Sequence, residues 1–295
     1  RDGVKWLNLA KRELIDIVPP EELFAYLDRH PVDIEAVIHM GAISSTVETD
    51  ADRIVATNYR LSLALWRWCA QNQVRLIYAS SAATYGDGAK GFDDAASPAA
   101  LAALRPLNAY GWSKNLFDRR VARLLAGHEA APPQWAGLKF FNVYGPNEYH
   151  KGAQKSVAVQ IHEQIAQGRP ARLFKSQRPD TADGGQLRDF IWVGDCVEIV
   201  LWLLDNPGVS GLFNCGTGKA RSFADLANAV FAALGKKPKI DYVPMPEPLR
   251  DKYQYFTEAR TDRLRAAGYG RPFVALEDGI ARYVRDYLAT ADPHR

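Results

Sequence analysis

Several features that define specialised classes of protein are scarce in this sequence of 295 residues. Its three cysteines are odd in number and widely spaced, which argues against a disulfide framework and favours buried, reduced thiols. The longest apolar run, 196–204, contains Glu198 and is too short to span a bilayer, and the first residues do not resemble a signal peptide. A formal net charge of +3 without a Lys/Arg block argues against nucleic-acid binding. We therefore expect a cytoplasmic protein that binds neither nucleic acid nor membrane.

The carboxylates lack the spacing of a metal-ligand cluster, so no metal site is predicted. The composition itself, 47% hydrophobic and 24% charged residues, is that of an ordinary globular protein. A chain of this length can bury a large core, as one domain or as a domain with a smaller lobe attached.

The order of the apolar segments predicts an α/β fold. Short apolar runs at 35–40, 75–79 and 138–143 are typical of buried parallel strands. Helical periodicity occupies 54–71 and a segment that ends near Leu125. Strands that alternate with helices at this spacing predict a doubly wound, Rossmann-type parallel sheet, which binds ligands beyond the carboxyl ends of its strands.

The pattern changes after residue 146. We expect residues 1–146 to form a dinucleotide-binding Rossmann domain, to which later segments such as 188–218 return. Residues 147–295 would mainly form a smaller, interleaved substrate-binding lobe, in which Ser222 caps a helix.

The Gly-rich turn that opens a dinucleotide-binding fold is also missing. Such a turn directs backbone N–H groups at the pyrophosphate, at the N-terminus of the first helix. The sequence begins at Arg1, and Gly216-x-Gly218 comes too late and lacks the third glycine. We therefore predict that the first βα unit, roughly 30–35 residues, lies outside this sequence.

A Tyr-x-x-x-Lys pair, Tyr110 and Lys114, indicates proton transfer at a hydroxyl group. Residues at i and i+4 share one helix face, and we expect the ammonium to lower the pKa of the tyrosine. Ser81, at the end of a predicted strand, could hold the reacting oxygen. The spacing is unspecific by itself, but the order Ser, Tyr, Lys and the strand-end position of the serine favour a catalytic role.

These residues, with Phe141-Asn-Val-Tyr-Gly-Pro146 and Arg188-Asp-Phe190, resemble the extended short-chain dehydrogenases/reductases that act on nucleotide sugars. A narrower resemblance, to the ADP-L-glycero-D-manno-heptose 6-epimerases, covers nearly the whole chain. Its most specific element is His150-Lys151-Gly152. The other matching segments are 40–46, 78–86, 213–218, 253–257 and 264–269.

The resemblance implies epimerisation at C6 of ADP-glycero-manno-heptose, from the D-glycero to the L-glycero form. Tightly held NADP would take a hydride from C6 and return it to the opposite face. This needs a proton partner on each side of the turning carbonyl group, and the resemblance implies Tyr110 and Lys151 in these roles. Lys114 would act on the tyrosine and the nicotinamide ribose, and Ser81 on the reacting hydroxyl. A homo-oligomer, a pentamer in this family, and a role in making the heptose precursor of the lipopolysaccharide core are also implied.

The resemblance also distributes binding roles. Cofactor contacts are expected at Lys5, Met40, Gly41, Ala42, Ile43, Ser44, Asn58, Lys114, Val143 and Lys151, where Lys5 could meet the 2′-phosphate of NADP. Substrate contacts are expected at Ser81, Asn142, Ala153, Gln160, Phe174, Lys175, Ser176, Gln177, Arg188 and Tyr253, with Arg188 suited to the diphosphate. Ala153 and Gln160 depart from the family pattern, which has Ser and His there.

Two other functions remain open. A UDP-hexose 4-epimerase needs only the serine, the tyrosine and the lysine. A non-catalytic dinucleotide sensor would keep the fold, although such proteins commonly lose the tyrosine or the lysine, and this chain keeps both. A 4,6-dehydratase is disfavoured, because Ala82 and Ala83 follow Ser81 where that reaction needs an acid and a base.

Overall fold

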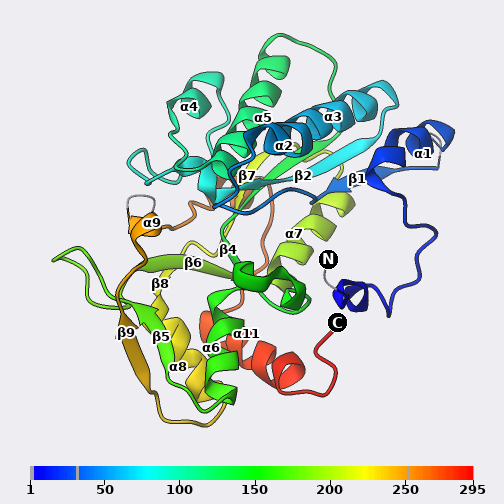
Figure 1. Ribbon diagram of the computed structural model, residues 1–295. Helices are drawn as coiled ribbons and strands as arrows, with labels where there is room; N and C mark the ends of the chain where they lie inside the picture. The colour runs from blue at the N-terminus through cyan, green and yellow to red at the C-terminus, as the bar shows by residue number, and fades with distance from the viewer. Residues whose placement is uncertain (1–2, 31–32, 251–252, 295) are drawn as a thin grey trace.

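The computed structural model describes residues 3–30, 33–250 and 253–294 and contains a parallel sheet of four strands in the order β1-β2-β3-β7 (Figure 1). These strands are β1 (Ala36–His39), β2 (Arg75–Ser81), β3 (Trp135–Phe140) and β7 (Gly211–Cys215). Every pairing is parallel. The predicted α/β class and parallel Rossmann-type sheet are therefore confirmed. The single strand predicted at 138–143 was wrong in its bounds. The structure has β3, which ends at Phe140, and a separate strand after it.

Helices cover both faces of this sheet. One face carries a helical run formed by α2 (Ala51–Ile54), a π-helical turn (Val55–Arg60) and α3 (Leu61–Gln71), together with α5 (Ala109–Ala126). The other face carries α7 (Val193–Asp205) and α10 (Asp262–Ala266). Side chains of β2 alternate between the two cores: Leu76 and Tyr78 pack with α3 and α5, and Ile77 packs with α7. This double coverage explains why the strands are continuous apolar runs.

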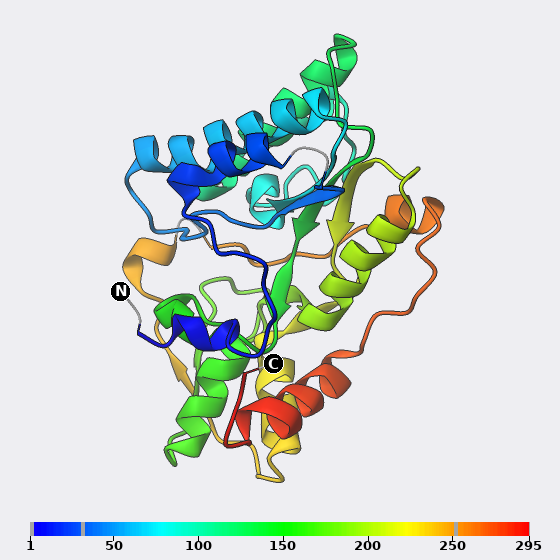
Figure 2. The same cartoon turned by 90° about the vertical axis from the view of Figure 1, so that its right-hand side faces the viewer.

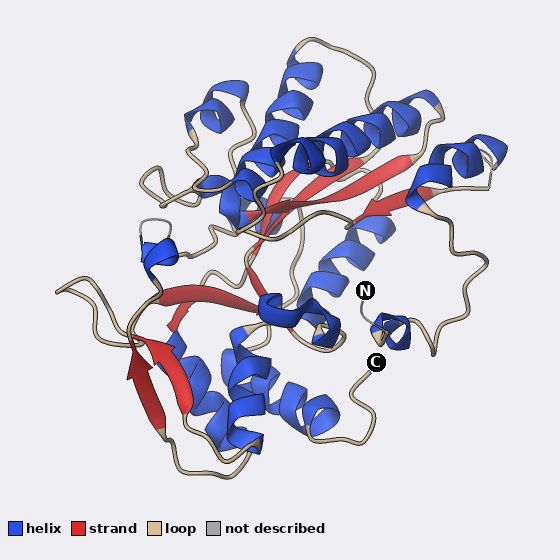
Figure 3. Ribbon diagram, viewed as in Figure 1, coloured by secondary structure: helices blue, strands red, loops and turns tan. Residues whose placement is uncertain are grey.

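A smaller lobe is built from short strands and a helical core (Figure 3). β4 (Asn142–Tyr144) pairs in parallel with β6 (Leu187–Trp192), which pairs antiparallel with β8 (Ala220–Ser222), while β5 (Ala171–Phe174) pairs with β9 (Ile240–Val243). Its helices are α6 (Val157–Ala166), α8 (Phe223–Ala233) and α11 (Leu276–Tyr283), which share one apolar core. The predicted cap of α8 is confirmed, since Ser222 and Asp225 form a capping box.

Strand β6 separates the two cores. Phe190 and Trp192 belong to the core of the small lobe, whereas Ile191 packs with α7 against the large sheet. From β6 the chain passes through α7 to β7, the edge strand of the large sheet. The remaining elements are α1 (Leu23–Arg29), α4 (Pro98–Ala103), α9 (Glu247–Arg250), 3₁₀ turns at Lys5–Asn8, Pro20–Glu22, Ala82–Tyr85 and Tyr149–Gln154, and a π-helical turn at Val284–Leu288.

The segment around Lys11 and the described C-terminal segment meet beside the small lobe (Figures 1 and 2). Lys11 forms an ion pair of 2.8 Å with Asp292, and Asn8 hydrogen-bonds to His150 at 2.9 Å. Cys69, Cys196 and Cys215 are buried and free, as predicted. Across the described residues, no helix is both long and apolar enough to cross a membrane.

Candidate active site

A pocket of about 370 Å³ lies where the large sheet meets the small lobe. Its walls come from the loop after β1, the ends of β2 and α5, strand β4 and the 3₁₀ turn at 149–154. Six residues predicted for the site line it together: Ser44, Ser81, Tyr110, Asn142, Val143 and Lys151. These residues are far apart in the sequence. The fold brings them together because the carboxyl ends of parallel strands lie at one edge of a sheet.

The start of α5 brings Tyr110 to the pocket. Asn108 caps the helix by accepting a hydrogen bond from the N–H of Gly111 at 2.8 Å, so Tyr110 is in the first turn. A Cβ at Gly111 would lie 2.5 Å from the carbonyl oxygen of Ala83. Only glycine therefore lets α5 pack this closely on the turn that follows Ser81. Ser81 lies close enough to Tyr110 to lower the pKa of that tyrosine.

The pKa of Tyr110 is raised above its usual value, so the expectation of a lowered pKa was wrong. Burial of the phenol is the main cause, and the nearby Ser81 offsets it only in part. The Lys114 ammonium was expected to interact with Tyr110. Its Nζ instead donates to the carbonyl of Ala79 at 2.8 Å. In this arrangement Tyr110 is a phenol that can donate a proton.

Lys114 is itself a buried cation. It is 3% exposed, and no carboxylate of the described residues forms an ion pair with it. Burial lowers the pKa of Lys114 to about 8, although the charge of Asp118 raises it. The pKa of His39 is lowered to about 4 by burial and then by Lys114, so this histidine is neutral.

An ion pair beneath the site was not predicted. Lys139 Nζ lies 2.8 Å from Asp118 Oδ2, and both side chains are fully buried. Ser80 Oγ also donates to Asp118 at 2.6 Å, and Lys139 donates to Thr84 at 2.7 Å. Two signals in the sequence could have indicated it: a lysine within an apolar strand, and an aspartate four residues after Lys114.

Asn58 fixes the loop that follows β1. It is fully buried within the π-helical turn, and its side chain bonds to both the N–H and the carbonyl of Ile43, at 2.8 and 2.9 Å. It also donates to Ser113 on α5 at 3.0 Å. π-Helical turns are frequent at functional sites. Next to this loop, a Cβ on Gly41 would meet nothing within 4 Å, so the backbone there faces open space.

Arg188 points to a different part of the small lobe, near the pocket. It is 6% exposed, and its guanidinium lies 5.0 Å from the ring centre of Tyr253 and 5.5 Å from that of Phe223, which lines the pocket. Phe174 contacts Tyr253 at a ring distance of 6.3 Å. No carboxylate in the described part of the chain pairs with Arg188, because its neighbour Asp189 accepts its hydrogen bonds from 217–218 and 259.

Other predicted residues lie outside the pocket lining. Lys5 is exposed in the 3₁₀ turn beside the Tyr149–Gln154 turn, and Ala153 is exposed on the latter. Gln160 donates to the carbonyl of Lys155 at 2.7 Å, while Ser176 accepts the N–H of Arg178 at 3.0 Å. The remaining predicted residues that do not line the pocket are Met40, Gly41, Ala42, Ile43, Asn58, Lys114, Phe174, Lys175, Gln177, Arg188 and Tyr253.

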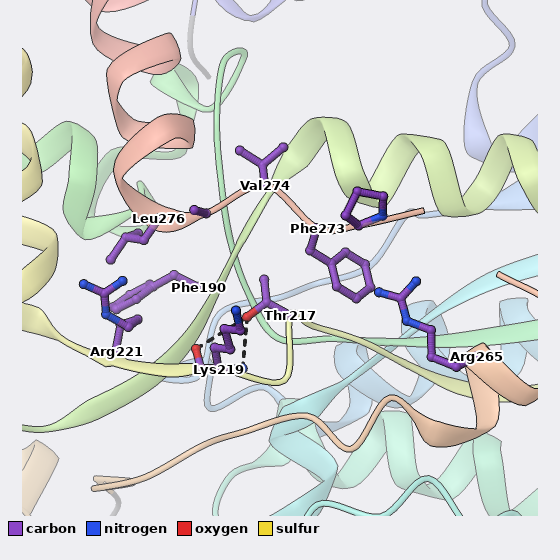
Figure 4. A pocket seen from close by; sticks show the side chains of 10 residues that line it. Phe190, Thr217, Lys219, Arg221, Arg265, Phe273, Val274 and Leu276 are labelled. Carbon is purple, nitrogen blue, oxygen red and sulfur yellow. Dashed lines mark hydrogen bonds between the residues drawn. The ribbon is translucent and has the colours of Figure 1, made fainter. Parts of the chain in front are cut away.

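A second pocket, of about 350 Å³, lies on the other side of β6 and shares only Phe190 with the first (Figure 4). Arg221, one of its three cationic residues, is already paired with Glu277 at 2.5 Å and Asp225 at 3.3 Å. Arg265 lies over the ring of Phe273 at 4.5 Å. Its lining offers Lys219 but no tyrosine, histidine or carboxylate as a second proton-transferring group, whereas Tyr110 and Lys151 line the first pocket together, so the first pocket is the candidate active site.

Comparison with known proteins agrees with this geometry. The model of the NAD dependent epimerase/dehydratase family matches residues 3–216. The chain belongs to this family. A relative named ADP-L-glycero-D-manno-heptose-6-epimerase, from Nitratidesulfovibrio vulgaris strain DP4, is 53% identical over 98% of this chain and 88% of its own length. One of the same name from Fusobacterium nucleatum is 45% identical over 98% of this chain and 89% of its own.

Solved structures of epimerases in this family are also similar. The ADP-L-glycero-D-manno-heptose-6-epimerase of Helicobacter pylori matches with a TM-score of 0.73 at 26% identity, over 96% of this chain and 81% of that one. The UDP-glucose 4-epimerase of Thermus thermophilus, in complex with NAD, matches with a TM-score of 0.70 at 25% identity, over 93% and 87%. The narrower resemblance to the heptose epimerases is therefore confirmed.

Proposed function

We propose that this protein epimerises ADP-glycero-manno-heptose at C6, from the D-glycero to the L-glycero form. The observation that carries the proposal is the meeting of Ser81, Tyr110 and Lys151 in one pocket. Tyr110 enters from α5 and Lys151 from the turn at 149–154, so two proton-carrying groups reach the pocket from separate elements. The heptose epimerase name of the relatives at 45–53% identity supports the same substrate.

Each group has a distinct task in this proposal. Tyr110 holds its proton, since burial raises its pKa, and donates it to the carbonyl oxygen as that oxygen becomes a hydroxyl. Ser81 orients the same oxygen. Lys151 accepts the proton of the C6 hydroxyl as the hydride leaves C6. After the carbonyl group has turned, Tyr110 returns a proton to its oxygen as the hydride comes back. A UDP-hexose 4-epimerase would need only Ser81, Tyr110 and Lys114, so the presence of Lys151 in the pocket favours the heptose.

The residues around the end of β1 fit a nicotinamide dinucleotide, which we propose to be NADP. The backbone at Gly41 faces open space, Asn58 fixes Ile43, and Lys114 is a buried ammonium without a carboxylate partner. Bound there, the dinucleotide would accept the hydride from C6 and return it. Met40 to Ser44, Val143 and Lys151 would complete the contacts. The preference for NADP over NAD, with Lys5 at the 2′-phosphate, rests on the family resemblance.

Arg188 supports a substrate that carries a diphosphate. A guanidinium that is 6% exposed and has no carboxylate partner in the described residues is suited to an anionic ligand. Its stacking on Tyr253 and the contact of Tyr253 with Phe174 provide flat surfaces beside it. We propose that these residues, with Asn142, Ala153, Gln160, Lys175, Ser176 and Gln177, hold ADP-heptose.

We further propose that residues 1–146, with β7, bind the dinucleotide and that the small lobe within 147–295 binds the nucleotide sugar. The protein would be a cytoplasmic homo-oligomer, a pentamer by family resemblance, that makes the heptose precursor of the lipopolysaccharide core. That the first βα unit lies outside this sequence stays a prediction.

The test is to incubate the full-length protein and NADP with each C6 epimer of ADP-mannoheptose and to follow the mixture by NMR. We expect both epimers to reach the same mixture. Turnover of UDP-glucose without turnover of ADP-heptose would establish the 4-epimerase alternative. Dinucleotide binding without turnover of either sugar would establish the sensor.

A further inference from the structure

The loop that carries Lys151, residues 149–155, is closed at its base by one carboxylate. Glu148 precedes this Lys151 loop and Ser156 follows it. Glu148 Oε2 accepts the N–H of Ser156 at 2.5 Å, and Oε1 accepts the Ser156 hydroxyl at 2.6 Å. Ser156 is also the N-cap of α6, so these bonds join the base of the loop to the first turn of a helix.

A third bond joins the same carboxylate to the core of the small lobe. The hydroxyl of Tyr283, on α11, donates to Glu148 Oε1 at 2.9 Å. Tyr283 is fully buried, and its pKa is raised by burial and then by the charge of Glu148, so it remains a donor. Glu148 is 5% exposed. A carboxylate this deeply buried is costly unless hydrogen bonds satisfy it, and three do so here.

The tip of the loop is held by its own backbone: the N–H of Lys151 donates to the carbonyl of Glu148 at 3.0 Å, and the N–H of Lys155 donates to that of Gly152 at 3.3 Å. Residues 151–154 are exposed, and Gly152 adopts φ +55°, where a Cβ would meet nothing within 4 Å. Other contacts hold the flanks: Tyr149 donates to the carbonyl of Pro293 at 2.8 Å, and Lys155 pairs with Glu163 at 2.5 Å. The position of Lys151 therefore depends mainly on the hydrogen bonds of Glu148 at the base of the loop.

We infer that Glu148 is the positioning residue for Lys151. Its three bonds fix the two ends of the loop against α6 and α11, so that Lys151 is held at the wall of the pocket that Tyr110 also lines. Glu148 lines the same pocket but does not carry the proton. This inference rests on the proposed role of Lys151 as an acid/base group. A displacement of about 1 Å at a catalytic group can lower a rate on the order of 100-fold.

The first experiment compares Glu148→Gln with Glu277→Gln, a matched loss of a carboxylate in the same lobe whose partner, Arg221, lies outside the pocket. We expect Glu148→Gln to lower kcat for ADP-heptose by roughly 10- to 100-fold and to leave KM within about 3-fold. Glu277→Gln should keep both. Tyr283→Phe removes one of the three bonds and should lower kcat less, which keeps the test usable if Glu148→Gln folds poorly.

A double variant separates positioning from general damage. In a Lys151→Met protein there is no ammonium left to position, so adding Glu148→Gln should lower the remaining rate by less than about 2-fold. Multiplied losses in the double variant, or a single Glu148→Gln protein with wild-type kcat, would overturn the inference. In the second case Lys151→Met would still be impaired, and the proposed function would survive.

Trypsin cleavage after Lys151 provides a readout that needs no substrate. We expect the folded Glu148→Gln protein to be cut there at least about 5-fold faster than wild type and Glu277→Gln, because the loop opens more often. Equal cleavage rates would overturn the inference even if the wild type epimerised no sugar. An inactive wild type with faster cleavage of the variant would instead reject the proposed function alone.

Discussion

Lys139 Nζ lies 2.8 Å from Asp118 Oδ2, and neither side chain is accessible to solvent. The pair joins the carboxyl end of β3 to α5, the helix that carries Tyr110 and Lys114. Ser80 and Tyr78 on β2 also donate to Asp118, at 2.6 and 3.3 Å. The floor of the candidate active site is thus a satisfied polar network inside an apolar core.

Removing one member of this pair should destabilise the protein severely. Asp118→Asn leaves the ammonium of Lys139 buried without its counter-charge, which we expect to lower the free energy of unfolding by about 3–5 kcal/mol. Asp292→Asn breaks the solvent-exposed pair with Lys11 and should change the free energy of unfolding little. Urea unfolding measures both. Similar losses in the two variants would show that Asp118 is not the required counter-charge.

Lys114 should lower the free energy of unfolding although the protein needs it for activity. Lys114→Met removes a buried cation, and we expect it to raise the free energy of unfolding at pH 7 by an amount on the order of 1–3 kcal/mol while activity is lost. Folding lowers the pKa of Lys114 from 10.5 to about 8. Between pH 8 and pH 10.5 the unfolded chain therefore holds a proton on Lys114 that the folded wild type has lost. The free energy of unfolding of the wild type rises with pH in this range.

The advantage of Lys114→Met should accordingly be largest below pH 8 and shrink toward pH 10.5. Thermal unfolding at pH 7, 9 and 10 measures this trend. An advantage that grows with pH would mean that Lys114 is not held in a disfavoured charged state.

Gly111 should tolerate no side chain. In Gly111→Ala the new Cβ would lie 2.5 Å from the Ala83 carbonyl oxygen, so α5 must move away from the turn after Ser81. We expect a loss of about 1–3 kcal/mol in stability and at least a 10-fold fall in kcat, since Tyr110 is the preceding residue. Gly208→Ala meets no atom within 4 Å and should change neither. If Gly111→Ala kept the kcat of the wild type, the close contact between Gly111 and Ala83 would not be needed to position Tyr110.

Arg188 should affect substrate binding more than the chemical step. Arg188→Gln removes the buried guanidinium beside Tyr253, and we expect KM for ADP-heptose to rise by about 10- to 100-fold with a smaller change in kcat. Arg221→Gln is the matched control, because Arg221 is the cross-strand neighbour of Arg188 and is paired with Glu277. Equal effects in both variants would indicate a general role of charge in this sheet.

The strand-end position of Ser81 and the Tyr-x-x-x-Lys pair predicted that Ser81 and Tyr110 act together, whereas Asn142, Val143 and Lys151 were expected from the family resemblance. The sequence did not predict the orientation of Lys114. Spacing places that lysine on the face of Tyr110, but only the packed structure shows its Nζ bonded to Ala79, with burial raising the pKa of the tyrosine.

Polar contacts between residues far apart in the chain could not be predicted from the sequence either. Asp118 and Lys139 lie on different elements, and Glu148 meets Tyr283 across 135 residues. The short strands β5 and β9 also escaped prediction, since four residues of mixed polarity carry too little periodicity. Periodicity thus predicted the large sheet, whereas contacts between distant elements required the structure.

The most direct test of the two-group site compares wild type, Tyr110→Phe and Lys151→Met, each starting from one C6 epimer of ADP-mannoheptose with NADP. NMR follows the appearance of the other epimer, and circular dichroism checks that each variant is folded. We expect wild type to equilibrate the two epimers and each variant to do so at least about 100-fold more slowly. Near-wild-type interconversion by folded Tyr110→Phe or Lys151→Met would contradict the account.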